Sequence, residues 1–127
     1  MASYRDLIVW QRAMEMVPAV YLVVRRLPPS ERYALGNQLC RAAISVAANI
    51  AEGQARQHGK EFVHALSIAR GSLAEVDTLL LIAVSLGYVA EAEVRHAQTL
   101  VLSTRQLLQR LIQRLRRDLI APRHRPS

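Results

Sequence analysis

Four long stretches of the chain place apolar residues at alternating three- and four-residue intervals, and short breaks separate them. The first stretch shows this interval at Leu7, Trp10, Met14, Val17, Tyr21 and Val24. Such a repeat follows one face of an α-helix, whereas a half-buried β-strand repeats every two residues. No strand pattern, internal repeat or low-complexity block competes with it. The sequence therefore predicts an all-α fold.

Helix-breaking residues mark the ends of four expected helices, at about residues 4–27, 31–56, 60–86 and 90–119. Pro28-Pro29 ends the first, Gly53 suits the end of the second, and Gly87 closes the third. Short connections between helices of similar length favour antiparallel neighbours. We therefore expect one domain at residues 1–120, an antiparallel up-down-up-down four-helix bundle. A basic, disordered tail is expected at residues 121–127.

Two features predict irregularities inside these helices. Pro18 lacks the backbone N–H that a helix interior uses, so a kink or local break is expected in the first helix. Gly36-Asn37 is a candidate interruption of the second helix, with Asn37 as the N-cap of its longer part.

The composition agrees with a helical, soluble domain. Hydrophobic residues make up 51% and aromatic residues only 5%, and Leu and Ala each occur 18 times. This apolar content excludes a disordered chain. The single cysteine excludes an intramolecular disulfide framework. No export signal is visible, and no apolar run approaches the length of about 20 residues that spans a bilayer. A cytoplasmic protein is expected.

The second helix carries a narrow polar stripe with apolar residues on both sides. The stripe consists of Gln38, Arg41, Ser45, Asn49 and Glu52. One apolar side can face the bundle core, but the other needs a second partner. We therefore predict an oligomer interface, which comprises Ile44, Ala47, Ala48 and Ala51. Residues 79–84 of the third helix are apolar all round and support this prediction, although a wide core stripe is the alternative.

The polar stripe itself has two interpretations. In the favoured one it is structural, because buried polar groups must find hydrogen bonds or ion pairs at helix junctions or between subunits. In the other it lines a ligand pocket, but no nucleophile and base accompany it.

The positive charge is concentrated at the C-terminal end. The net charge is +7, and 16 of the 17 basic residues are arginine. Residues 105–127 hold seven arginines and one acid, and no acid occurs at residues 94–117. Guanidinium groups suit phosphate, so we predict a nucleic-acid-binding face. Its residues are Arg105, Arg110, Arg114, Arg116, Arg117, Arg123 and Arg125. An acidic protein partner and a merely solvated face are the alternatives.

Motifs for catalysis are missing. The sequence has no Gly-rich phosphate loop, HExxH, paired CxxC or G-x-S-x-G. The four histidines are dispersed, and Cys40 has no convincing base partner. We expect a non-enzymatic protein without metal or cofactor.

Several segments resemble a known family. Residues 41–53 read Arg-Ala-Ala-Ile-Ser-Val-Ala-Ala-Asn-Ile-Ala-Glu-Gly, and residues 68–75 read Ile-Ala-Arg-Gly-Ser-Leu-Ala-Glu. Lys60-Glu61-Phe62 and Leu86-Gly87-Tyr88 stand at matching places. Together they are similar to the bacterial four-helix-bundle proteins first described from intervening sequences in 23S rRNA genes. The match covers roughly residues 4–115, so the Arg-rich end lies at its margin.

The resemblance implies an antiparallel bundle assembled as a ring-like homopentamer, without an established biochemical activity. The accessory protein of diversity-generating retroelements, similar in fold, is a basic pentamer that binds nucleic acid, and this analogy favours RNA. The sequence departs from the family pattern at Pro18, Gly36-Asn37, Cys40 and Ala47. We expect a homo-oligomer that binds RNA in preference to DNA. The alternative function is a scaffold that docks an acidic protein.

Overall fold

The computed structural model describes residues 3–56 and 58–120, and within them it contains helices and no strand. The α-helices are α1 (Ile8–Arg26), α2 (Leu35–Arg56), α3 (Gly59–Ser85) and α4 (Glu91–Ile120). Two 3-10 turns precede α1 and α2, namely η1 (Tyr4–Asp6) and η2 (Pro29–Glu31). The all-α four-helix prediction is confirmed. The predicted tail, with Arg123 and Arg125, lies outside the described residues.

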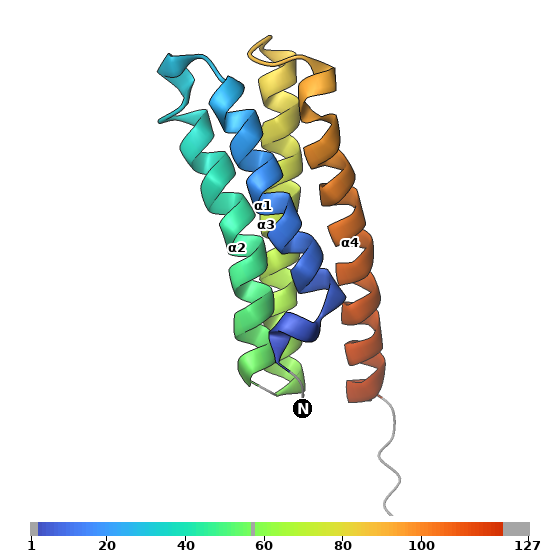
Figure 1. The fold of residues 1–127 in the computed structure, drawn as a ribbon. Helices are drawn as coiled ribbons and strands as arrows, with labels where there is room; N and C mark the ends of the chain where they lie inside the picture. Colours follow the sequence, from blue (N-terminus) through green and yellow to red (C-terminus); the bar gives the residue numbers. More distant parts are fainter. Residues whose placement is uncertain (1–2, 57, 121–127) are drawn as a thin grey trace, which may run out of the picture.

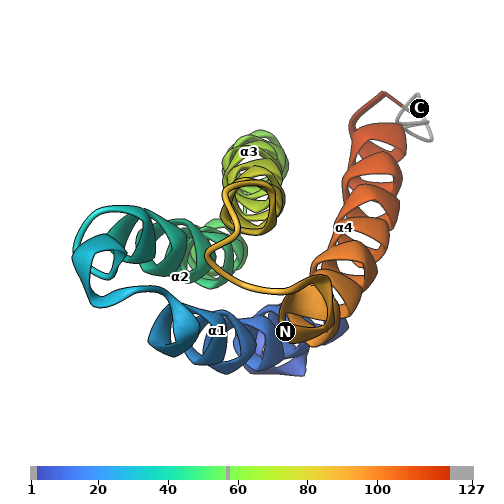
Figure 2. The same cartoon turned by 90° about the horizontal axis from the view of Figure 1, so that it is seen from above.

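The helices form an antiparallel bundle (Figure 1). Each helix packs against two others, in the cyclic order α1, α2, α3, α4, and the α2–α3 pairing is the most extensive. The view from above shows α1 between α2 and α4, with α3 across from it (Figure 2). No helix in the described part of the chain is both long and apolar enough to cross a membrane.

The core is aliphatic, as the composition predicted. Each helix contributes side chains that are fully buried, among them Met16, Leu39, Leu73 and Leu108. Burial of one such side chain stabilises the fold by roughly 1.5–3 kcal/mol. Because the buried residues recur every three or four positions, the core lies along the bundle axis.

Both predicted irregularities differ in the structure. Of the kink or local break predicted at Pro18, the break is wrong, because α1 continues through this residue; burial of Ala19 and Val20 in the core offsets the one lost hydrogen bond. The predicted interruption by Gly36-Asn37 is also wrong, since both residues lie in the first turn of α2. Gly36 is buried there, and a Cβ on it would lie 2.9 Å from Val24 Cγ1.

The two expected C-terminal glycines have different roles. Gly87 adopts a φ of 74° directly after α3, and Tyr88 N–H donates to Ala83 O while Gly87 N–H donates to Val84 O. These two bonds form a Schellman motif, which confirms Gly87 as the stop. The expectation for Gly53 is wrong, because α2 continues to Arg56. Gly53 is instead buried where α2 meets α3.

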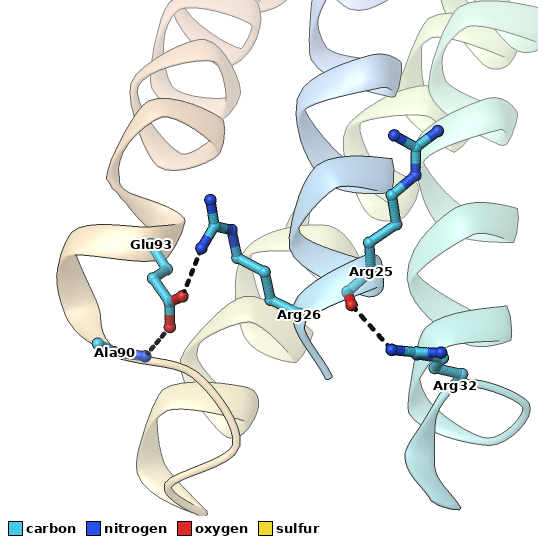
Figure 3. A network of polar contacts seen from close by, with 5 residues as sticks. All are labelled: Arg25, Arg26, Arg32, Ala90 and Glu93. Carbon is cyan, nitrogen blue, oxygen red and sulfur yellow. Dashed lines mark hydrogen bonds and ion pairs between the residues drawn. The ribbon is translucent and has the colours of Figure 1, made fainter. Parts of the chain in front are cut away.

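Glu93 ties the end of α1 to the start of α4 (Figure 3). One carboxylate oxygen accepts from Ala90 N–H and the other from the Arg26 guanidinium, both at 2.8 Å. The bond from Ala90 N–H, followed by the Arg26 contact, holds the pKa of Glu93 below its usual value. Beside this pair, Arg32 donates to the Arg25 carbonyl at 3.1 Å and holds the η2 end against α1 (Figure 3).

The lowered pKa of Glu93 gives stability a defined pH dependence. The folded state favours the ionised carboxylate, so its contribution is present above the usual glutamate pKa of about 4.3 and is lost as pH falls through the lower folded pKa. Glu93→Gln should lower the melting temperature near neutral pH, and this difference should shrink in acid. Thermal unfolding across pH measures it, with Glu91→Gln in the same helical turn as the control. A pH-independent difference would contradict the prediction.

Candidate nucleic-acid interface

A groove of about 460 Å³ lies at the end of the bundle where the chain begins and α4 finishes. Its lining comprises Asp6, Leu7, Ile8, Val9, Leu107, Arg110, Leu111, Arg114 and Arg117. The antiparallel pairing of α1 with α4 brings these two segments side by side (Figure 1). One turn further along, the Arg12 guanidinium donates to Ser103 Oγ across the same helix pair.

Three of the predicted arginines meet in this groove. Arg110, Arg114 and Arg117 are exposed, and none lies within ion-pair distance of a carboxylate among residues 3–56 and 58–120. Their spacing places them on one side of α4, with Arg114 and Arg117 about 6 and 10.5 Å from Arg110 along the helix axis. The groove is therefore a site of concentrated positive charge, which Asp6 on the opposite wall offsets in part.

The other predicted arginines are not part of the groove. Arg105 lies on the α3 side of α4, where its guanidinium is 4.0 Å from the Asp77 carboxylate. Arg116 is exposed but does not line the groove. The structure thus divides what the sequence predicted as one continuous face, because the helix turns the five described arginines toward different neighbours.

The N-terminal wall of the groove was not predicted from the sequence. This wall, Asp6 to Val9, is fixed by local contacts: Leu7 N–H donates to Tyr4 O at 3.0 Å, and Gln11 Nε2 donates to Arg5 O at 2.8 Å. Up-down-up-down topology places the start of a first helix and the end of a fourth at the same end of the bundle. That rule was available from the sequence and could have pointed to Asp6 and Ile8.

The polar stripe of α2 has the contacts of the structural interpretation. Ser45 Oγ lies 2.9 Å from Ser72 Oγ of α3, and Asn49 Nδ2 donates to Ser45 O and Oγ at 2.9 and 3.0 Å. Glu52 pairs with Arg56 at 3.5 Å. Of these contacts, Ser45–Ser72 joins α2 to α3, and those of Asn49 and Glu52 lie within α2. The remaining two members of the stripe, Gln38 and Arg41, are exposed.

The predicted oligomer interface is only partly available on the surface. Ile44 is 46% exposed, Ala48 is exposed and Ala51 is half-buried. Ala47 is only 7% exposed, so its assignment to an interface between copies is wrong. Ala47 lies on the inward side of α2. The apolar residues of this helix span a wider arc than its solvent-exposed face does, so some of them, including Ala47, are buried in the bundle. On α3, Leu81 and Ile82 are exposed while Leu79 and Leu80 are buried.

The remaining candidates for chemistry are the Cys40 thiol, as a nucleophile, and the His, Cys, Asp and Glu side chains, as metal ligands. Burial raises the pKa of the half-buried Cys40 thiol, and a hydrogen bond from Tyr21 opposes this shift. A raised thiol pKa leaves less of the nucleophilic thiolate at neutral pH. Within the described ranges, no three His, Cys, Asp or Glu side chains gather to hold a metal ion.

These features define a class of protein, a small antiparallel four-helix bundle with an arginine-lined groove at one end. The model of the 23S rRNA-intervening sequence protein family matches residues 5–110. The chain therefore belongs to this family. The matched residues include Arg110, whereas Arg114 and Arg117 follow them.

A solved structure has a similar fold. It is described as a protein with unknown function from the S23 ribosomal protein family of Bacteroides thetaiotaomicron. The TM-score is 0.76 at 20% sequence identity, with 83% of this chain and 98% of that chain covered. At this identity the likeness shows the fold alone. A comparison with curated proteins gives no match.

Proposed function

We propose that the protein is a non-enzymatic, cytoplasmic homo-oligomer that binds nucleic acid, RNA in preference to DNA, through the arginine-lined groove. One observation carries this proposal: the guanidinium groups of Arg110, Arg114 and Arg117 line one groove and lack a carboxylate partner in the described part of the chain. On a merely solvated helix, opposite charges at i,i+3 or i,i+4 would neutralise such a row. Here only Arg114 has an acid at such a spacing, Asp118 at i+4, and the two side chains form no ion pair.

The chemistry of the groove suits phosphate. A guanidinium presents planar donors that match phosphate oxygens, and such charge-assisted hydrogen bonds are stronger than neutral ones. Contacts of this kind position a nucleic acid by its backbone and carry no base sequence information. Binding through these arginines alone is therefore expected to be independent of sequence.

Titration of a single-stranded RNA over a salt series tests the proposal. The affinity should fall linearly on a double-logarithmic plot from about 50 to 200 mM salt, with a slope of about −0.7 for each phosphate contacted. Polyglutamate of matched charge serves as the competitor. Absence of binding at low salt would contradict the proposal, and equal binding of polyglutamate would indicate an acidic protein partner instead.

The proposed homo-oligomer is supported by the apolar side chains that the single bundle leaves exposed. They occur on all four helices and include Leu22, Ile44, Leu81 and Ile82. Where exposed apolar side chains form a contiguous patch, the patch marks an association site. The family resemblance implies a pentamer, in which copies of a weakly binding groove would act together and raise the overall affinity.

Ile44→Glu should dissociate the oligomer. A charge in place of Ile44 would have to be buried without a partner in the interface, which is costly. Light scattering coupled to gel filtration measures the mass of wild type and variant. Leu102→Glu on α4 is the control, because Leu102 and Ile44 are both 46% exposed. A monomeric wild type, or an oligomer that Ile44→Glu leaves intact, would overturn this interface.

A further inference from the structure

The arginine-lined groove also has an apolar side that phosphate binding leaves unexplained. Leu7, Ile8 and Val9 come from the start of α1, and Leu107 and Leu111 come from α4. Ile8 is 59% exposed and Leu107 is half-buried, so both present surface to a ligand in the groove. A ligand that fits this lining combines negative charge with a flat, apolar group.

We propose that the groove binds single-stranded rather than duplex nucleic acid, with phosphates on Arg110, Arg114 and Arg117 and one unpaired base against Ile8 and Leu107. This inference rests on the proposed function and specifies the form of nucleic acid that the site takes. It also makes the N-terminal segment part of the binding site, although the distribution of charge along the chain does not point to this segment.

The distinction follows from what each form of nucleic acid can present. In a duplex the bases are paired and stacked inside, so the apolar wall would face only the sugar–phosphate backbone. An unpaired strand can turn a base outward and lay its face on a side chain while its phosphates remain on basic residues. The groove volume of about 460 Å³ lies in the range that holds small-molecule-sized groups.

The negative charge of Asp6 allows a test of phosphate binding in the groove, because its removal should strengthen RNA binding and not weaken it. Its carboxylate lines the same groove as the three arginines and carries the only negative charge among the described lining residues. It therefore repels a phosphate bound there. Asp6→Asn should tighten RNA binding about threefold at low salt, whereas Glu75→Gln, which removes a negative charge from the exposed side of α3, should not.

Three RNA probes of equal length separate base contacts from phosphate contacts: a single strand, the duplex of the same sequence, and a single strand with abasic sites. Wild type should bind the single strand most tightly. Ile8→Ser should weaken single-strand binding about tenfold and leave abasic and duplex binding unchanged. Leu86→Ser at the opposite end of the bundle is the control, because Leu86 and Ile8 are both 59% exposed. Circular dichroism melting verifies that each variant is folded.

The outcomes distinguish this inference from the proposed function. If duplex and single strand bind equally and Ile8→Ser changes neither, the base contact is wrong while salt-dependent RNA binding by the groove still stands. If none of the three probes binds at low salt, the proposed function fails as well. Weaker binding of all three probes by Ile8→Ser would also overturn the inference, because it would show a general loss of the groove.

Discussion

Replacing Arg110, Arg114 and Arg117 together by glutamine is expected to weaken RNA binding about 100-fold per contacting subunit. The three side chains line one groove and have no carboxylate partner in the described residues, so their removal breaks no ion pair there. Each lost phosphate contact also lowers the number of counterions released. The slope of the salt dependence should therefore become shallower by about 2.

The control for this variant removes the same charge elsewhere. Arg25, Arg41 and Arg95 are exposed and likewise have no carboxylate partner in the described residues. Their joint replacement by glutamine should change RNA affinity only slightly, because surface charges beyond about 10 Å are largely screened at moderate salt. Equal losses in the two triple variants would show that net charge alone governs binding, and the groove would lose its assigned role.

Gly53→Ala is expected to lower the free energy of unfolding by about 1–2 kcal/mol. A Cβ at this position would lie 2.7 Å from Ala65 Cβ and 3.0 Å from Phe62 Cδ1. The Cβ of Ala65 is fixed to the backbone of α3, so it cannot move aside, and α2 and α3 must separate. This cost exceeds the gain of about 1 kcal/mol that alanine brings to an exposed helix interior.

Gly71→Ala is the matched control and should have the opposite effect. Gly71 lies exposed in the middle of α3, and a Cβ there would meet no atom within 4 Å. The substitution should raise the free energy of unfolding by roughly 0.5–1 kcal/mol, because glycine loses more backbone freedom on folding. Chemical denaturation measures both variants. If Gly53→Ala also stabilised the protein, the close α2–α3 contact would be wrong.

The helices were predictable because their signals are local. Apolar spacing over one face, Pro28-Pro29 and Gly87 each act within a few residues, so the four α-helices appear near their expected positions. Pro18 shows the limit of local rules. Proline removes one hydrogen bond, but neighbouring side chains buried in the core keep α1 continuous.

The candidate site was predictable only in part. A surplus of arginine near the C-terminus is visible in the sequence, and three of the arginines it singled out, Arg110, Arg114 and Arg117, line the groove. The pairing of Arg105 with Asp77 was not visible, because these residues are distant in sequence and meet only where α4 packs on α3. The roles of Ala47 and Gly53 were misjudged for the same reason.

The sequence by itself determined the all-α class, the number of helices, the family and the concentration of charge at one end. These properties depend on residue type and on spacing within one helix. The tertiary structure alone decided which arginines share a groove with Asp6 and Ile8, and why α2 carries glycine at position 53. Both depend on the rotation and register of one helix against another, which the packing of side chains across the whole bundle sets.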